Sequence, residues 1–393
     1  MSNPWRRFKA LNPDTEVWWD SSPLVWPSFK ESYLKNVSDD DRDWFKEETG
    51  SMFLGDTPVE NWLFDGCTTN PPLSWAVLKT SPAEWDQIIR EKRSAYSGRS
   101  RYGLFIEVYK EVVKRGAEKF LPLFEASDGK FGHISGQVDP QLMHNGPRMK
   151  EMAEELADLA PNVMIKIPGS TDGIPVFKHL ASKGIATNAT TVFTLAQIMA
   201  VARNVAEGRK LHLSGPSKPR KGWRAVCTHM AGRLEDSASF RGYVNRMNLD
   251  ISPFELRYAS EAVVKKAAKL FVDRDLPIKM LVCSARKHHD SRNEVFYPHI
   301  DMFAGGPIVN TVPGKVFGDV MVAYRNREIP NNWDREVPDD KIDKLSQVPY
   351  FQQAYHEYGF HVEQFDEIPS LIENEVDFVG AAKEMIAYVG SFL

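Results

Sequence analysis

Short apolar segments alternate with longer amphipathic segments along most of this chain, and this alternation constrains the fold more than any other feature. Eight strands are expected, at residues 16–20, 62–66, 132–138, 162–167, 185–188, 224–228, 278–283 and 295–301. Helical patterns separate them, for example at residues 146–160, 171–183, 191–207 and 253–273. Alternating strands and helices predict a parallel sheet, and eight such units favour a closed (β/α)₈ TIM barrel. An open doubly wound sheet is the alternative.

The barrel is expected to occupy residues 1–328, and the pattern changes after that point. Residues 329–393 begin with several chain-breaking residues and continue as an acidic, aromatic-rich helical segment. Because this segment is too apolar for a disordered tail, we expect a C-terminal helical appendage packed on the barrel. Residues 211–222 are expected to form an exposed loop, in which the basic residues Lys218, Arg220 and Lys221 are solvated.

Composition limits the classes of partner. Hydrophobic residues make up 42% of the 393-residue chain, charged residues make up 26%, and the net charge is −4, which predicts a globular protein without a nucleic-acid-binding surface. No apolar run approaches the roughly 18 residues that a membrane span needs. Residues 1–11 lack the apolar stretch of a signal peptide. Three scattered cysteines without a CxxC pair suit a reducing cytoplasm, where we expect the protein to reside.

Lys166 lies near the end of the apolar fourth strand, in the segment NVMIKIP. A lysine in such a strand either extends to water at the rim or sits inside the barrel with a lowered pKa. The second case yields a neutral amine, which is the form that attacks a carbonyl group. Chemistry in this fold occurs at the C-terminal ends of the strands, where Lys166 is expected. The segment by itself leaves both alternatives open.

Polar residues recur at the ends of the other expected strands. They are Asp20, Asn70, Gln137, Asn188, Thr190, Thr228, Arg233, Ser284 and Arg286. In a barrel these side chains form one ring of functional groups. Each has a structural alternative, because Thr-Thr-Asn-Pro at Thr68 to Pro71 also suits a turn and Asn188 also suits a helix cap.

Several of these segments, in this order and spacing, resemble the transaldolase family of class I aldolases over roughly residues 15–325. The matching segments are TTNP at Thr68 to Pro71, VDP at Val138 to Pro140, IKIP at Ile165 to Pro168 with Gly173, GIATN at Gly184 to Asn188 with Thr190, Gly232-Arg233, and Ser284-Ala-Arg286. The ordered set is far more specific than any single motif.

The resemblance implies a role for each matching residue. Lys166 matches the Schiff-base nucleophile, and Asp20 matches the general base for carbon–carbon cleavage. Asn70 and Asn188 match residues that hold donor hydroxyl groups, and Thr190 matches the threonine that orients the catalytic water. The positions that bind the substrate phosphate match Arg233, Ser284 and Arg286. Two guanidinium groups and a hydroxyl suit an anionic oxygen cluster.

The sequence also departs from the family pattern. The family's glutamate after the third strand is Gln137, which can position water but cannot shuttle a proton. The related fructose-6-phosphate aldolases also have glutamine there, but they pair it with a tyrosine where this chain has Met230. Thr228, His229 and Met230 replace the family's Ser-Pro-Phe. His229 is therefore a candidate acid or base, with a structural histidine as the alternative.

The sequence therefore predicts a transaldolase-like transferase that moves a dihydroxyacetone unit between sugars, a ketose and an aldose that are expected to be phosphorylated. The alternatives are an aldol lyase, favoured by Gln137, and a non-catalytic sugar-phosphate-binding barrel, which the trio of Lys166, Asp20 and Thr190 argues against. No cofactor and no metal are expected, because adjacent His288 and His289 on one loop are more typical of a solvent-facing pair than of a metal site. A homo-oligomer is compatible with the sequence.

Overall fold

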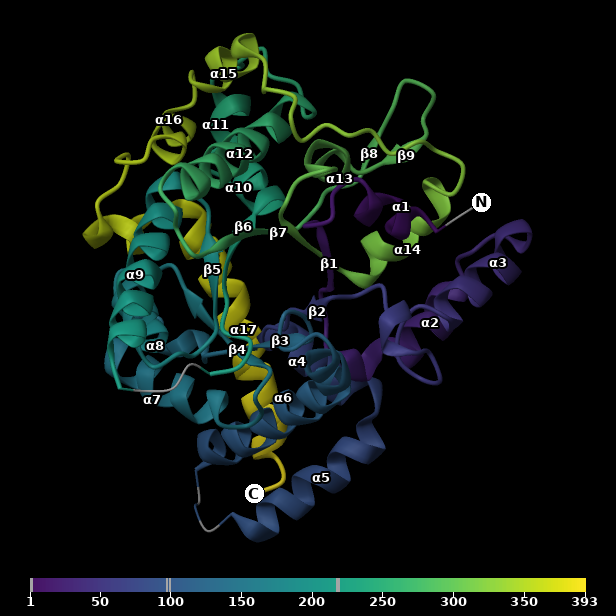
Figure 1. Ribbon diagram of the computed structural model, residues 1–393, viewed down its shortest axis with the longest axis vertical. Coiled ribbons are helices and arrows are strands. Elements are labelled where there is room, and N and C mark those ends of the chain that lie inside the picture. The colour runs from purple at the N-terminus through teal and green to yellow at the C-terminus, as the bar shows by residue number, and fades with distance from the viewer. Residues whose placement is uncertain (1–2, 97, 99, 217–219) are drawn as a thin grey trace.

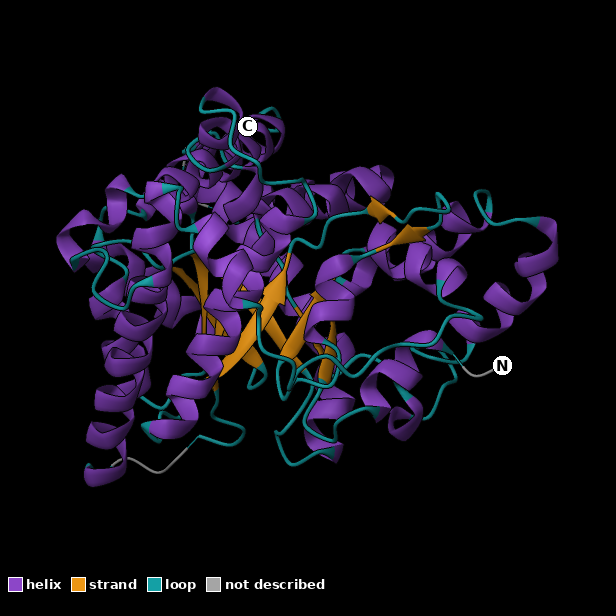
Figure 2. Cartoon of the chain, turned by 90° about the horizontal axis from the view of Figure 1, so that it is seen from above, coloured by secondary structure: helices purple, strands orange, loops and turns teal. Residues whose placement is uncertain are grey.

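Eight parallel strands form a closed barrel in the computed structural model, which describes residues 3–96, 98, 100–216 and 220–393. The barrel strands are β1 (Glu16–Trp19), β2 (Gly66–Cys67), β3 (His133–Gln137), β4 (Val163–Pro168), β5 (Thr187–Val192), β6 (Ala225–Met230), β7 (Lys279–Cys283) and β10 (Val309–Val312). Their order around the barrel is β1-β10-β7-β6-β5-β4-β3-β2. Figure 2 shows the strands at the centre, enclosed by helices. The predicted (β/α)₈ barrel is confirmed.

Helices connect the strands and cover the barrel (Figure 1). Those within the barrel repeat are α4 (Pro71–Thr80), α5 (Pro82–Ala95), α6 (Arg101–Ala126), α7 (Gly146–Ala157), α8 (Ile174–Ser182), α9 (Leu195–Ser214), α10 (Ala231–Asp236), α11 (Arg241–Arg246), α12 (Tyr258–Asp273), α13 (Pro298–Phe303) and α14 (Gly314–Ala323). Short 3₁₀ helices are η1 (Pro23–Val25), η2 (Val59–Asn61), η3 (Pro140–Leu142) and η4 (Glu255–Arg257). The four helical patterns predicted from the sequence correspond to α7, α8, α9 and α12.

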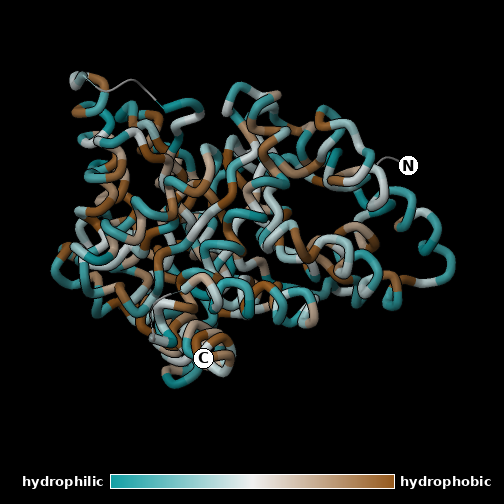
Figure 3. The backbone as a smooth tube through the Cα atoms, turned by 90° about the horizontal axis from the view of Figure 1, so that it is seen from below, coloured by the Kyte–Doolittle hydropathy of each residue, from teal (hydrophilic) through white to brown (hydrophobic). Residues whose placement is uncertain are grey.

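The N-terminal segment adds α1 (Pro4–Ala10), α2 (Trp26–Leu34) and α3 (Asp39–Gly50). Helix α1 packs on the barrel, where the Trp5 ring stacks on Phe317 of α14 with the centroids 6.0 Å apart. Helix α3 extends away from the barrel and is hydrophilic along most of its length (Figures 1 and 3). Its first turn carries three aspartates, which the N-terminal end of a helix stabilises.

The prediction of the eighth barrel strand at residues 295–301 is wrong. Only Val295 and Phe296 are extended, as β9 (Val295–Phe296), which pairs antiparallel with β8 (His288–His289) outside the barrel. Pro298 then begins α13, where its missing N–H is not needed. The barrel closes instead through β10, which pairs with β1 on one side and β7 on the other.

The C-terminal region is helical and consists of α15 (Asp339–Leu345), α16 (Pro349–Tyr355), η5 (Val362–Glu367) and α17 (Pro369–Gly390). Helix α17 packs against α4, α6 and β5. Hydrogen bonds hold the segment before it, since the backbone N–H of Thr171 donates to Asp366 at 2.9 Å. The boundary at residues 328 and 329 stays a prediction.

The expected loop at residues 211–222 is only partly described. Residues 211–214 are helical and belong to the end of α9, so the helix is longer than the pattern predicted. Lys218 lies outside the described residues. Among the described residues, no helix is both long enough and apolar enough to cross a bilayer.

The barrel interior contains three layers of inward-facing side chains. The middle layer is a separate apolar cluster contributed by six strands, namely Trp18, Met164, Ala186, Val226, Leu281 and Val309. Because side chains alternate along a strand, residues two positions away face the same interior. Toward the C-terminal ends these are Asp20, Lys166, Asn188, Thr228, Cys283 and Thr311. The layer of the barrel that this fold uses for chemistry is therefore polar.

Candidate active site

Lys166 is buried inside the barrel on β4, with only 4% of its surface exposed, so it does not extend to water at the rim. Its Nζ donates a hydrogen bond to the carbonyl oxygen of Thr69 at 3.2 Å. Burial lowers the pKa of Lys166 because it disfavours the ammonium form, and the charges of Asp20 and Cys283 offset only part of this effect. A buried amine of lowered pKa is suited to attack a carbonyl group.

Asp20 follows β1 and faces the same interior as Lys166. Burial raises the pKa of the Asp20 carboxyl, while the charge of Lys166 and a hydrogen bond from the Thr68 hydroxyl, at 2.7 Å, act in the opposite direction. The Thr68 hydroxyl also lies 2.5 Å from the hydroxyl of Thr311 on β10. A carboxylate of raised pKa beside a buried amine is a suitable general base.

Asn188 on β5 connects side chains of two other strands across the barrel interior. Its Nδ2 donates to the hydroxyl of Ser135 on β3 at 3.0 Å, and its Oδ1 accepts from the hydroxyl of Thr228 on β6 at 2.6 Å. Asn188 therefore lies in the strand itself and does not cap the next helix, because Thr194 caps α9. All three side chains are buried, and together they form a fixed polar wall beside Lys166.

Thr190 and Gln137 each have a buried polar atom available for a ligand. Among the described residues, neither Thr190 Oγ1 nor Gln137 Oε1 has a hydrogen-bond partner. Thr190 precedes Thr191, whose φ of 51° is rare for a β-branched residue, and the pairing of β5 with β6 shifts register here. Backbone strain of this kind persists where the surrounding structure fixes a side chain in place.

Asn70 lies at the start of α4, and its Oδ1 accepts a hydrogen bond from the backbone N–H of Leu73 at 2.9 Å. The side chain therefore caps the helix, a function that the sequence suggested for Asn188 and not for Asn70. Asn70 directly follows Thr69, whose carbonyl oxygen accepts the hydrogen bond from Lys166. The structure thus places Asn70 near the amine, with a structural function of its own.

Arg233 and Arg286 line one cavity of about 500 Å³ at the C-terminal end of the barrel. Gly232 lets Arg286 approach the backbone of α10, because a Cβ at this position would lie 2.6 Å from the Cγ of Arg286. Ser284 makes the turn into this segment with a φ of 63°. The Arg286 Nε donates to Asp236 at 2.6 Å, and the Arg233 Nη1 donates to Asp377 of α17 at 2.7 Å. The structure therefore brings together the arginines that the sequence suggested.

His229 faces away from this interior. Its Nε2 lies 3.0 Å from the hydroxyl of Ser260 on α12, whereas its neighbour Thr228 points inward to Asn188. Burial lowers the pKa of His229 to about 3, so the ring is neutral near pH 7. The structure thus separates His229 from Lys166 and Asp20, because adjacent residues of a strand face opposite sides.

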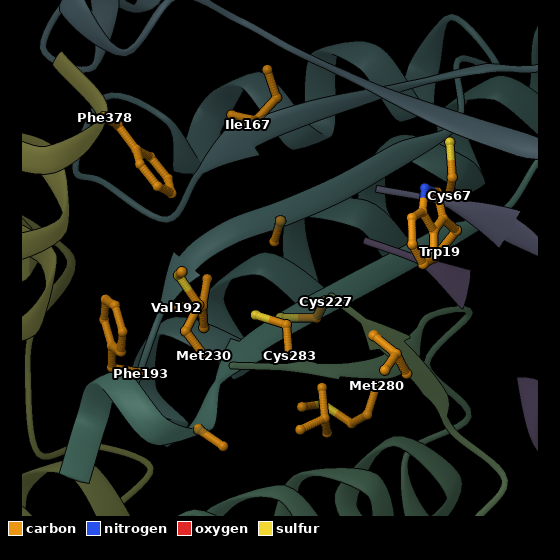
Figure 4. Close-up of a cluster of buried hydrophobic side chains, with 14 of the residues drawn as sticks. Trp19, Cys67, Ile167, Val192, Phe193, Cys227, Met230, Met280, Cys283 and Phe378 are labelled. Carbon is orange, nitrogen blue, oxygen red and sulfur yellow. The ribbon is translucent and has the colours of Figure 1, made fainter. Parts of the chain in front are cut away.

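Four polar residues of the barrel interior were not among the predicted site residues. Thr68, Ser135 and Thr311 hold the polar ring together, and Cys283 faces it from β7. Counting in steps of two along each strand identifies them once the strands and their inward faces are known. The predicted C-terminal helical appendage includes α17, but the contribution of this helix to the site was not predicted, and Figure 4 shows Phe378 reaching from it toward the barrel strands.

Volume alone does not identify this site. A cavity of about 560 Å³ lies between α12 and residues 333–342, but Lys166, Asp20 and Arg286 do not line it. We locate the site by its chemistry, because the barrel interior places a fully buried amine whose pKa is lowered near a carboxyl whose pKa is raised. Within the described residues, no group of three histidine, cysteine or acidic side chains is arranged to hold a metal ion.

Comparison with known proteins gives consistent matches. A family model described as Transaldolase/Fructose-6-phosphate aldolase matches residues 56–343, well over half of the chain. A transaldolase of Thiobacillus denitrificans is 33% identical over 171 residues, which are 43% of this chain and 45% of that protein. A transaldolase of Saccharopolyspora erythraea is 25% identical over 240 residues, which are 61% of this chain and 57% of that protein. The matches thus span about half the length of these curated relatives.

Proposed function

The chain belongs to the transaldolase/fructose-6-phosphate aldolase family, and we propose that it transfers a dihydroxyacetone unit from a ketose to an aldose through a Schiff base on Lys166. The observation that carries this proposal is the buried amine of Lys166, whose pKa is lowered, facing the carboxyl of Asp20, whose pKa is raised. Opposed shifts of this kind assign one group to nucleophilic attack and the other to proton transfer.

The neutral amine of Lys166 attacks the ketose carbonyl and gives a carbinolamine, which loses water to form the Schiff base. Asp20 then accepts the proton of the hydroxyl group beside the scissile bond. The carbon–carbon bond breaks and an aldose leaves. The electron pair of the broken bond stays on the three-carbon unit and converts its Schiff base into an enamine. Attack of this enamine on an acceptor aldehyde forms the new bond, and the proton returns from Asp20. Water then hydrolyses the new Schiff base and frees the product.

A water molecule leaves when the carbinolamine becomes the Schiff base, and one adds when the Schiff base is hydrolysed. Both steps need a fixed binding position for water. The unpartnered Thr190 Oγ1 and Gln137 Oε1 are suited to hold that molecule. Because an amide does not titrate, we assign the proton exchange to Asp20 and water. His229 has no part in this scheme, since it bonds to Ser260 on the outer face of β6.

The polar wall of Asn188 and Thr228, with Asn70 at the start of α4, suits the hydroxyl groups of a sugar. Arg233 and Arg286 suit a terminal phosphate, because their cavity lies at the same end of the barrel. We therefore propose phosphorylated sugars as substrates.

Trapping of the Schiff base tests the proposal. Borohydride together with a phosphorylated ketose should leave a reduced three-carbon adduct, and mass mapping should place it on Lys166. The matched control is Lys178→Ala, which removes an exposed lysine paired with Glu207 and should leave trapping unchanged. An adduct on another lysine would falsify the proposal, and no adduct with any ketose would favour a non-catalytic sugar-phosphate-binding barrel.

The second candidate function is an aldol lyase that releases dihydroxyacetone. Gln137 favours it, since no glutamate stands at this position to assist the proton transfers of the transferase. Assays with and without an acceptor aldose separate the two functions. A transferase turns over only with the acceptor, whereas a lyase releases free dihydroxyacetone without it.

A further inference from the structure

A buried charged cluster lies directly behind Arg286, and the proposed reaction does not use it. It consists of Glu235 on α10, Arg257 on η4 and His299 on α13, which are 0%, 7% and 1% exposed. Ionised groups such as Glu235 and Arg257 are costly to bury unless they are paired, so this cluster requires an explanation.

Glu235 is the centre of this cluster. The Arg257 Nη1 donates to Glu235 Oε2 at 2.5 Å, and the His299 Nε2 lies 3.1 Å from Glu235 Oε1. Burial alone would raise the pKa of Glu235, but the interactions with His299 and Arg257 outweigh it and lower the pKa. Glu235 is therefore an ionised anchor that holds both neighbours.

Two connections run from this cluster to Arg286. The backbone N–H of Arg286 donates to His299 Nδ1 at 3.2 Å, so Nδ1 is the acceptor and the ring proton lies on Nε2, facing Glu235. Arg257 also contacts Asp236 Oδ1 at 3.3 Å, and Asp236 Oδ2 accepts from the Arg286 Nε at 2.6 Å. Both the peptide group and the guanidinium of Arg286 are thus attached to the same buried anchor.

We propose that His299 and Glu235 are positioning residues that fix Arg286 in its anion-binding conformation. Arg286 follows a turn in which Ser284 has a φ of 63°, a conformation that costs energy and persists only when its surroundings hold it. The bond from the Arg286 peptide to His299 is one such restraint. The inference rests on the proposed role of Arg286 in binding the substrate phosphate.

Two substitutions of His299 separate the two bonds of its ring. In His299→Asn, the side-chain Oδ1 takes the place of Nδ1 and still accepts from the Arg286 N–H. In His299→Gln, the amide nitrogen takes the place of Nε2 and still donates to Glu235, but the acceptor for Arg286 is lost. His299→Asn therefore keeps an acceptor for the Arg286 N–H, whereas His299→Gln removes it.

A hydrogen bond contributes about 0.5–1.5 kcal/mol, which corresponds to roughly a 2- to 10-fold change in binding. For His299→Gln we expect KM for the phosphorylated ketose, and Kd for inorganic phosphate measured by calorimetry, to rise by about 5- to 10-fold. For His299→Asn we expect a rise of about 2-fold or less. In both variants kcat, and the concentration of dihydroxyacetone that gives half-maximal borohydride trapping on Lys166, should be unchanged.

Equal effects of the two variants, or a loss in kcat without a change in phosphate Kd, would overturn the positioning role. Borohydride trapping of dihydroxyacetone on Lys166 is measured in parallel, because its failure concerns the proposed function and not His299. If His299→Gln does not fold, hydrogen exchange in the wild-type protein tests whether the Arg286 N–H is held by a hydrogen bond. The Arg286 amide should then exchange at least about 10-fold more slowly than an unprotected amide, and unprotected exchange would overturn the proposal.

Discussion

The two ends of the barrel interior use buried charge in opposite ways. At the N-terminal end, Glu16 accepts hydrogen bonds from Arg224 at 2.8 Å and from Lys279 at 2.7 Å. At the C-terminal end, Asp20 and Lys166 face each other without a salt bridge among the described ion pairs, and Lys166 bonds to a carbonyl oxygen. The apolar layer around Trp18 and Met164 separates the two ends.

The pKa shifts express this difference. At the N-terminal end, burial opposes ionisation of Glu16, yet Arg224 and Lys279 outweigh it and lower the pKa to about 2. At the C-terminal end burial dominates, so the pKa of Asp20 rises and that of Lys166 falls. Full pairing of buried charges stabilises the fold, whereas incomplete pairing leaves the groups reactive at a cost in stability.

The largest expected effect is that of Lys166→Met. Removing the nucleophile should reduce kcat by at least about 10⁴-fold and abolish borohydride trapping. The melting temperature should stay the same or rise, because an amine that is costly to bury is replaced by an apolar side chain of similar length. A fall in melting temperature together with retained activity would show that Lys166 is structural.

Asp20→Asn should lower kcat by about 10²–10⁴-fold while Schiff-base trapping persists. Since the charge of Asp20 raises the pKa of Lys166, its removal should lower that pKa further. The pH profile of trapping should therefore move to lower pH. The control is Asp86→Asn, at a half-exposed helix position that bonds to Tyr388, and it should leave the profile unchanged.

Glu16→Gln should change stability and leave activity intact. Removing one partner of a buried ion network costs about 3–5 kcal/mol in the free energy of unfolding, measured with denaturant. Because the folded pKa of Glu16 is lowered from 4.5 to about 2, its contribution is fully present above about pH 4.5 and is lost as the pH falls toward 2. The difference between wild type and variant should shrink over that range.

The control for Glu16→Gln is Glu151→Gln, which pairs with Arg148 at the surface, where both side chains are 59% exposed. An exposed pair contributes about 0–1 kcal/mol, so this variant should be close to wild type. Equal losses in the free energy of unfolding in the two variants would show that the buried pairing of Glu16 contributes no more than a surface pair.

The smallest expected effect is that of Asp377→Asn. Arg233 and Asp377 are 33% and 58% exposed, so their ion pair contributes about 0–1 kcal/mol. Without this competing carboxylate, KM for a phosphorylated ketose should fall by up to about 5-fold, with no change for dihydroxyacetone. Glu384→Gln, on the same helix but bonded to Trp75, should change neither value.

The sequence predicted the polar ends of the strands better than the last element of the barrel. Strand-end residues such as Lys166, Asn188 and Arg286 were identified because a period-two apolar pattern and its end are local features. Residues 295–301 and β10 are both short apolar segments, and the choice between them depends on pairing with β1 and β7. No local pattern contains that information.

The sequence by itself determined the alternation of strands and helices, the polar ends of the strands, and the presence of Lys166 on the fourth of them. Only the tertiary structure decided that His229 faces α12, that Glu16 meets Arg224, and that α17 brings Asp377 to Arg233. These contacts join residues between 31 and 208 positions apart in the chain. They follow from barrel closure and helix packing, which bring distant segments together after local preferences have already been satisfied.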